Sequence, residues 1–185
     1  MTQVSQTELQ EKLAYFGQSP TDVGVIKQIV RRPAVDQRET ITEGVLTLEE
    51  GLVGDSWRAR GNRKTPDGSA LLDAQLTLMN ARVIEVIAGH QDQWPLAGDQ
   101  FFVDFDLSEE RLPAGTVLKI GDALIEVTAE PHLGCRKFSD RFGKDATLFV
   151  NSTPGKALRA RGVNAKVIRG GEVRVNDSIS VYSEG

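Results

Sequence analysis

The sequence TVLKIGDALIEVT, residues 116–128, has the pattern of two short strands joined by a tight turn. Residues 116–120 and 123–128 are rich in β-branched and aliphatic side chains, and Gly121-Asp122 between them is a two-residue hairpin signal. Such a hairpin places consecutive strands side by side in an antiparallel sheet. The stretch therefore predicts a β-hairpin.

Similar strand-like runs occur on both sides of this hairpin. They lie at residues 23–32, 40–49, 74–79, 100–106, 163–169, 172–175 and 178–182. Gly170-Gly171 separates two of these runs and predicts a second hairpin. Strands outnumber helices and do not alternate regularly with them. We therefore expect a β-rich chain, mainly β, that forms a barrel or a strongly coiled sheet with short peripheral helices.

Short helices are expected around this sheet. Ser5-x-x-Glu8 is a capping box, and Leu9, Leu13 and Phe16 then form one apolar face of a helix. Three further helices are expected. One covers residues 81–88 behind the N-cap Asn80, one is one or two turns that carry Phe138 and Phe142 and end at Gly143, and one covers residues 155–161 behind Thr153-Pro154. We expect residues 1–20 to hold an accessory N-terminal helix and residues 21–185 to form one β-barrel domain.

Composition narrows the class of protein. The chain has 185 residues, enough to bury roughly 70% of its unfolded surface without a disulfide or metal. Its net charge of −4 and pI near 5.3 disfavour general nucleic-acid binding. The N-terminus lacks the apolar core of a signal peptide, and no apolar run approaches the ~20 residues of a membrane span. With one cysteine, the expectation is a soluble cytoplasmic protein.

The segment PHLGCRKF, residues 131–138, is where the sequence concentrates reactive side chains. It holds the one cysteine, Cys135, and one of the two histidines, His132, followed by Arg136 and Lys137. Neighbouring cations and a helix start favour a thiolate, which can act as a nucleophile, a persulfide carrier or a soft metal ligand. The alternatives are a buried, inert cysteine and a histidine that only hydrogen-bonds backbone.

Three groups of cations are the other candidate site residues. They are Arg58, Arg60, Arg63 and Lys64; Arg136, Lys137 and Arg141; and Arg159 and Arg161. Each can be a solvated face of an acidic protein, or the three can converge on one anionic small molecule. The first group lies in a long polar loop at residues 56–73, directly after the turn GLVGD in which Asp55 can orient the loop.

Several ordered pieces of the chain resemble the MOSC family, which is related to the C-terminal part of molybdenum cofactor sulfurases. These pieces are GLVGD at 51–55, QLTLMNA at 75–81, LAGDQ at 96–100, LPAGT at 112–116, IEVT at 125–128 with Cys135, and RGVNAKV at 161–167 with Gly171 and Asp177. The resemblance covers about residues 23–181. The order of the pieces and the position of Cys135 after the EVT strand make the combination specific.

The resemblance implies a MOSC-type β-barrel with one reactive cysteine, Cys135, that carries sulfur as a persulfide or ligates the molybdenum of a pterin cofactor. Candidate cofactor-binding residues are Asp55, Arg58, Arg63, Arg136, Lys137 and Arg161, with His132 beside the cysteine. Relatives that are complete enzymes reduce N-hydroxylated compounds with electrons from partner proteins. The family is also associated with pyridoxal phosphate, which the parent sulfurases use in a separate domain.

This chain departs from the family pattern at two places. Many relatives have histidine shortly after the GxxGD turn, where this chain has Ser56-Trp57, and proline before the cysteine, where it has Gly134. These departures leave an alternative in which the chain is a non-enzymatic binding domain for small anions with an inert cysteine. A cysteine hydrolase ranks last, because no orienting partner for His132 is evident.

Overall fold

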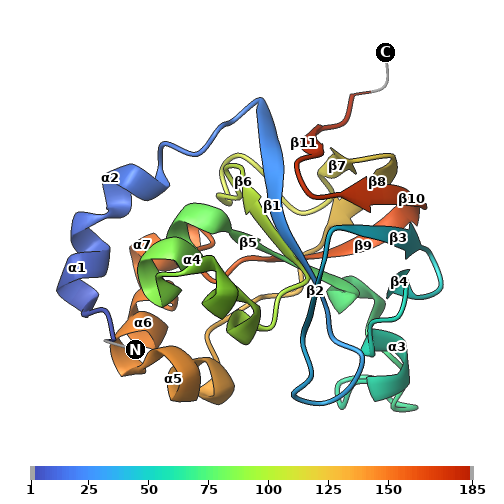
Figure 1. The fold of residues 1–185 in the computed structure, drawn as a ribbon, viewed down its shortest axis with the longest axis horizontal. Coiled ribbons are helices and arrows are strands. Elements are labelled where there is room, and N and C mark those ends of the chain that lie inside the picture. The colour runs from blue at the N-terminus through green and yellow to red at the C-terminus, as the bar shows by residue number, and fades with distance from the viewer. Residues whose placement is uncertain (1–2, 184–185) are drawn as a thin grey trace.

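A computed structural model of the chain describes residues 3–183 and contains a closed β-barrel of seven strands (Figure 1). Each strand is hydrogen-bonded to the next around the barrel. In barrel order they are β11 (Ser178–Val181), β7 (Val117–Ile120), β8 (Ala123–Val127), β9 (Val163–Arg169), β5 (Leu76–Asn80), β6 (Phe101–Asp104) and β1 (Val23–Arg31). The expected β-rich class and barrel architecture are confirmed.

The barrel closes between the two most distant strands of the chain, β1 and β11, which pair antiparallel with Val23 opposite Ser180. One pair is parallel: β5 and β6 are joined through α4 (Ala81–Ala88) and η2 (Gln91–Ala97). Strand β2 (Glu39–Ile41) pairs with β1 outside this ring.

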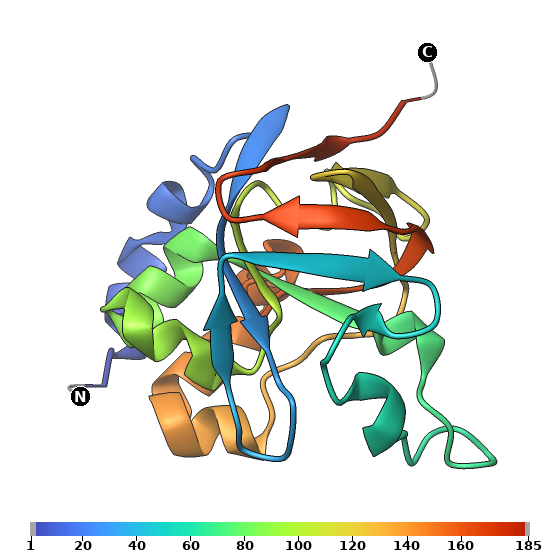
Figure 2. The same cartoon turned by 45° about the vertical axis from the view of Figure 1, so that its right-hand side comes forward.

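A second, three-stranded sheet lies against the barrel. Its order is β10 (Gly171–Arg174), β3 (Glu43–Thr47) and β4 (Gly51–Leu52). Figure 2 shows β3 and β10 side by side, in cyan-blue and orange-red. Leu46, Leu52 and Val173 of this sheet are fully buried in the same apolar cluster as the barrel interior, so the sheet extends the barrel core.

The helices gather mostly on one side of the barrel and form a second apolar cluster with it (Figure 1). They are α1 (Gln6–Glu11), α2 (Leu13–Phe16), α4, α5 (Arg136–Phe142), α6 (Lys144–Val150) and α7 (Thr153–Ala157), while α3 (Trp57–Arg60) and η1 (Leu72–Ala74) lie elsewhere. Neighbouring phenylalanines divide the two clusters. Phe101 enters the barrel core and Phe102 packs under the helices, because consecutive strand residues face opposite ways.

Most local expectations are confirmed. Gly121 has φ 55 in the turn between β7 and β8, and Asn80 caps α4 by accepting from the backbone N–H groups of Arg82 and Val83. The capping box of Ser5 and Glu8 is also present. The N-terminal helix, however, is divided at Lys12, and the run expected at residues 40–49 is divided into β2 and β3.

Two other expectations are wrong in detail. Gly170-Gly171 does not form a hairpin, since β9 pairs with β5 and β8 whereas β10 pairs with β3. The glycines are needed for close packing: a Cβ on Gly170 would lie 2.7 Å from the carbonyl oxygen of Leu46. Helix α7 is capped by Ser152 rather than Thr153, and it ends at Ala157.

None of the helices among residues 3–183 combines the length and apolarity that crossing a membrane requires.

Candidate functional site

Cys135 lies at the junction between an extended segment and helix α5. It occupies the N-cap position, with φ −108° and ψ 177°, and its backbone carbonyl accepts the N–H of Ser139. The thiol is free and exposed. The alternative of a buried cysteine is therefore wrong. The thiol can be reached from solvent by a reagent or a ligand.

The backbone before the thiol is clamped to α6. The side chain of Asn151 accepts from the N–H of Gly134 and donates to its carbonyl oxygen, both at 2.9 Å. A Cβ on Gly134 would lie 2.8 Å from Cγ2 of Val150. The hydrogen bonds explain why this chain lacks the proline that many relatives have here, because proline has no N–H to donate to Asn151. The short Cβ distance explains why the residue is glycine.

His132 points into the protein, toward a buried carboxylate. Its Nε2 lies 2.7 Å from Oδ1 of Asp99, whose other oxygen accepts from Nη1 of Arg161 at 2.6 Å. Asp99 is fully buried, and Arg161 also donates to the carbonyl of Ala97 and stacks over the ring of Phe138 at 4.9 Å. We call these three residues the Asp99 network; it ties the Cys135 segment to the loop before β6 and to the start of β9.

Charges in this network fix the protonation state of each member. Burial alone would raise the pKa of Asp99, but Arg161 and His132 outweigh it and lower that pKa to about 2. Burial lowers the pKa of His132, and the charge of Arg161 lowers it further against the opposing effect of Asp99. Asp99 is thus ionised and His132 neutral at pH 7. Since Asp99 can only accept, Nε2 of His132 carries the hydrogen.

Asp55 forms a second buried ion pair, with Arg32. Its two oxygens accept from Nε and Nη2 of Arg32 at 2.8 and 2.9 Å, and it also accepts the backbone N–H of Trp57. Trp57 is buried and donates from its indole to the carbonyl of Leu71. Asp55 and Trp57 thus shape the loop at residues 56–73, which accounts for Trp57 where many relatives have histidine nearby.

Three arginines lie around Gly98: Arg32, Arg38 and Arg141. Together with the exposed Arg60, whose charge acts on Arg38, we call them the Gly98 arginine group. Arg32 donates to the carbonyl of Gly98, while Arg38 and Arg141 each lie 3.9 Å from the position of a Cβ on Gly98. Nε of Arg38 is buried without a hydrogen-bond partner among the residues that the structure describes.

The positive charges of this group act on one another. The pKa of Arg38 is lowered by burial and then by the charges of Arg141 and Arg32, against the opposing charge of Asp36. Burial also lowers the pKa of Arg60, with Arg32 adding to the effect and Asp55 opposing it. An anion placed here would oppose the repulsion between these positive charges, although not the effect of burial.

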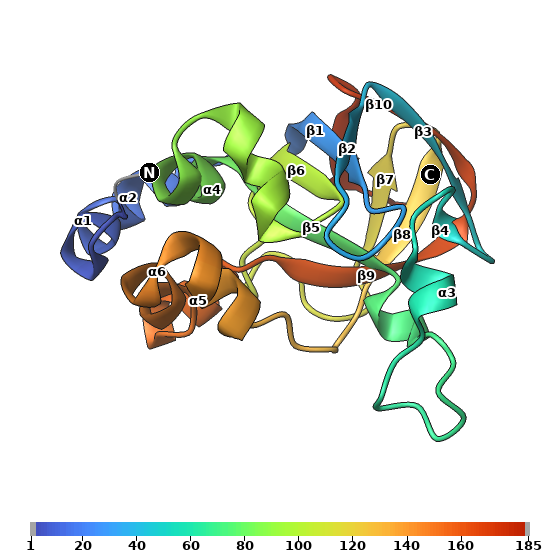
Figure 3. The ribbon, with the colours of Figure 1, turned by 60° about the horizontal axis from the view of Figure 1, so that its bottom comes forward.

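The remaining predicted site residues lie outside these networks. Arg58, Arg63, Arg136 and Lys137 are all exposed, and the Arg136 side chain is 95% exposed. The loop at residues 56–73 nevertheless reaches the segment before Cys135, since Lys64 pairs with Glu130 and Thr128 donates to the carbonyl of Asp73. Figure 3 shows this segment, between β8 and α5, on the same side of the molecule as α3.

Sequence reasoning missed Asp99, Arg32 and Arg38. Asp99 was read only as part of a turn, and its partners lie 33 and 62 residues further along the chain. The one available signal was Asp99 within the LAGDQ piece of the resemblance, because a turn carboxylate between two apolar runs can be buried only with a cationic partner.

Comparisons with known proteins agree with this architecture. A family described as MOSC domain matches residues 72–180, more than half of the chain. The YuaD protein from Bacillus subtilis is similar in structure, with TM-score 0.61, 14% identity and coverage of 88% of this chain and 97% of that one. YiiM from Escherichia coli matches with TM-score 0.54, 22% identity and coverage of 87% and 71%. Among curated protein sequences, nothing matches.

Proposed function

The chain belongs to the MOSC domain family, and we propose that it binds a molybdenum-pterin cofactor or carries sulfur through the thiol of Cys135. The observation that carries the proposal is an exposed thiol at the start of α5, a helix that also supplies Arg141 to the Gly98 arginine group. Arg141 follows Cys135 by six positions, roughly 9 Å along a helix axis. A thiol and a group of cations thus lie at the two ends of one helix.

The residues present fit such a cofactor. A thiolate is a soft ligand suited to a transition metal, and arginine is the side chain best matched to a phosphate. The unpaired Nε of Arg38 offers a buried donor that a phosphate oxygen could accept. When bound, the cofactor supplies redox chemistry, such as the reduction of N-hydroxylated compounds with electrons from a partner protein.

The chain's own residues hold the thiol in place. The Asn151 clamp fixes the Gly134 peptide, and the Asp99 network fixes His132 three residues before the sulfur. Asp99 is an orienting partner for His132 that the sequence did not reveal, but no hydrogen bond joins His132 to Cys135 among the described residues. This geometry favours a sulfur carrier or metal ligand over a cysteine hydrolase, which needs the histidine at the thiol.

Metal and pterin analysis tests the cofactor role. Wild-type protein, Cys135→Ser and Arg141→Gln would be expressed in a host that makes the cofactor, with Lys119→Gln as the control for loss of an exposed cation. We expect molybdenum in the wild type and the Lys119 variant, and its loss in the other two. No molybdenum in the wild type, or equal loading of Cys135→Ser, would exclude the ligand role.

Mass spectrometry tests the sulfur-carrier role. A donor persulfide transfers its terminal sulfur to the Cys135 thiolate, so that the donor leaves as a thiolate and Cys135 becomes a persulfide with no net oxidation. We expect an adduct of one sulfur atom on the wild type and none on Cys135→Ser. An unmodified wild-type protein after incubation with the donor contradicts this role.

The Gly98 arginine group supports a second candidate function, a non-enzymatic domain that binds small anions and in which Cys135 is inert. The group does not need the thiol to hold an anion. In this case phosphate binding, measured by calorimetry, would be lost in Arg141→Gln and retained in Cys135→Ser, while the thiol alkylates no faster than a free peptide cysteine.

A further inference from the structure

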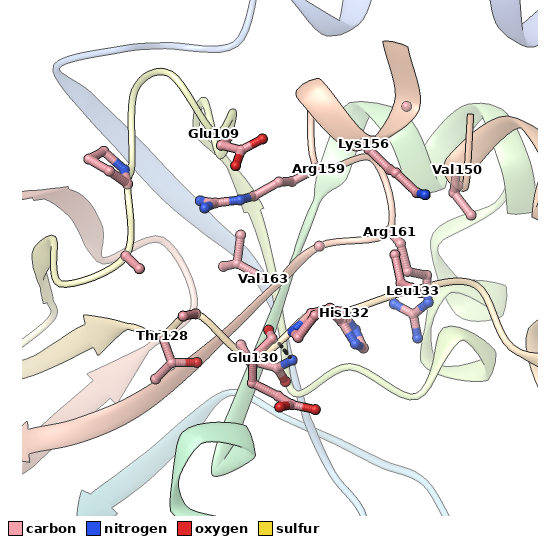
Figure 4. Close-up of a pocket in the computed structure, with 17 residues that line it drawn as sticks. Glu109, Thr128, Glu130, His132, Leu133, Val150, Lys156, Arg159, Arg161 and Val163 are labelled. Carbon is pink, nitrogen blue, oxygen red and sulfur yellow. Dashed lines mark hydrogen bonds between the residues drawn. The ribbon is translucent and has the colours of Figure 1, made fainter. Parts of the chain in front are cut away.

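A cavity of about 320 Å³ lies beside the Cys135 segment without including Cys135 (Figure 4). Its walls come from the loops at residues 109–114 and 128–133, from α7 and from the start of β9. The volume is at the lower end of the range of small-molecule sites, roughly 300–1,000 Å³. Polar groups line it from three parts of the chain that are far apart in sequence, and the function proposed above assigns no role to Lys156 or Arg159 among them.

His132 presents a hydrogen-bond acceptor to this cavity. The ring lines the cavity and its Nε2–H is held by Asp99, so a neutral ring has its lone pair on Nδ1. No hydrogen bond to Nδ1 is present among residues 3–183, so this atom is free to accept one from a molecule in the cavity that the ring lines. Asp99 and Arg161 fix the orientation of the ring from behind.

Two cations face the same space from α7 and the turn after it. Lys156 and Arg159 both line the cavity, and Figure 4 shows their side chains extending in opposite directions, Arg159 toward Glu109 and Lys156 toward Val150. Arg159 has φ 46°, a left-handed conformation that is unfavourable for a non-glycine residue. Its guanidinium is partly buried and donates to the carbonyl of Leu112. Burial lowers its pKa, opposed by the charge of Glu109.

The carboxylates around the cavity do not fully balance these cations. Glu130 is paired with Lys64 outside the cavity, and its backbone carbonyl accepts from Asn164. Glu109 is therefore the one unpaired lining carboxylate among the described residues, against Lys156 and Arg159. The cavity thus has an excess of one positive charge, which suits a monoanion.

We propose that this cavity binds a small organic carboxylate that also carries a hydroxyl or N–H donor. Arg159 binds the carboxylate, Lys156 adds a second positive charge to the cavity wall, and Nδ1 of His132 accepts a hydrogen bond from the donor. The Asp99 network fixes the orientation of the ring that carries this acceptor. The site is independent of Cys135 and of any cofactor, so its test does not depend on the function proposed above.

Hydroxybenzoates are suitable probes, because the three isomers place a hydroxyl at three distances from one carboxylate. Wild-type protein labelled with ¹⁵N would be titrated with 2-, 3- and 4-hydroxybenzoate, with benzoate, and with the hydroxybenzamide that matches the tightest isomer. Benzoate lacks the donor and hydroxybenzamide lacks the charge. The second histidine of the chain, His90, is 88% exposed on its side chain and serves as an internal control.

We expect one hydroxybenzoate to bind about threefold to tenfold more tightly than benzoate, the value of one hydrogen bond. Adding this isomer should shift the ¹⁵N resonance of Nδ1 of His132 and leave the resonances of His90 unchanged. Hydroxybenzamide should bind at least about tenfold more weakly, since it loses the charge-assisted bonds. Arg159→Gln and Lys156→Gln should each weaken hydroxybenzoate about tenfold, and Lys119→Gln should not.

Failure of all three hydroxybenzoates to bind overturns the proposal, as does binding that Arg159→Gln and Lys156→Gln leave unchanged. Chemical-shift changes at Arg38 and Arg141, and none at His132, would assign the anion to the Gly98 arginine group. That result would also overturn the proposal. Equal affinity for benzoate and the best hydroxybenzoate would remove the role of His132. The thermal midpoint of each variant, measured alongside, shows that the binding data refer to folded protein.

Discussion

His132 and Cys135 stand three residues apart on one segment and lie in opposite environments. His132 is engaged by the fully buried Asp99 and, through it, by Arg161, while Cys135 is free and exposed at the start of a helix. The Asn151 clamp on Gly134 lies between them. The segment is therefore anchored at one end and open at the other. The comparison indicates that stability depends on the anchored end and reactivity on the open one.

Replacing Asp99 should have the largest effect, because it leaves Arg161 buried without a counter-charge. We expect Asp99→Ala to lower the free energy of unfolding by about 3–5 kcal/mol, measured by urea denaturation. Asp92→Ala is the matched control: Asp92 also pairs with a histidine, His90, but its side chain is 67% exposed. That control should change stability by less than about 0.5 kcal/mol. Similar losses in both variants would refute the anchoring role of Asp99.

Gly134→Ala tests the boundary between the two ends. The added Cβ would lie 2.8 Å from Cγ2 of Val150, and we expect overpacking to cost about 1–3 kcal/mol in the same urea assay. Gly17→Ala is the control, since its Cβ would meet neighbouring atoms only at 3.6 and 3.7 Å. A Gly134→Ala protein as stable as the Gly17 variant would show that α6 does not constrain the segment.

Acid should loosen the anchored end in two stages. His132 has a pKa below its ordinary value of 6.5, so its contribution to stability is present above pH 6.5 and is lost as the pH falls toward the folded value. Asp99, lowered from 3.8 to about 2, contributes above pH 3.8 and loses roughly 2 kcal/mol as the pH falls toward 2. Unfolding free energies of wild type and His132→Gln would be compared between pH 8 and pH 4. If the free energy of unfolding falls with pH in the same way in both proteins, His132 does not cause the first loss of stability.

The open end should give the smallest change in stability. We expect Cys135→Ser to alter the free energy of unfolding by less than about 0.5 kcal/mol, because the thiol packs against little. In native protein, iodoacetamide should modify Cys135 at least as fast as in urea-unfolded protein. Slow modification that speeds up only on unfolding would mean that the thiol is covered and that the two ends are alike.

The sequence predicts features of the fold that depend on neighbouring residues. The β7–β8 hairpin follows from Gly121-Asp122, and α4 follows from Asn80, because a turn or a cap needs only a few adjacent positions. Gly170-Gly171 carries the same hairpin signal, yet its strands pair elsewhere. The partner of β10 is β3, more than 120 residues earlier, and no local pattern contains that choice.

The same distinction between neighbouring and distant residues applies to the candidate site. Cys135 and the helix after it were predicted from the segment itself. Asp99 and Arg32 were missed because their roles arise only when the chain is closed: Asp99 meets Arg161 from 62 residues away, and Arg32 meets Asp55 from 23. A charged residue in an apolar turn is a signal that such a partner exists, but not where it lies.

Closure of the barrel by β1 and β11 has a consequence for how the protein is made. Strand β1 begins at Val23 and its partner β11 ends at Val181, so the last barrel seam forms between segments that are synthesised far apart in time. During translation the hydrogen-bonding edges of β1 and β7 stay unpaired until Ser178–Val181 leave the ribosome. Nascent chains stalled before that point should be the form of this protein most in need of a chaperone.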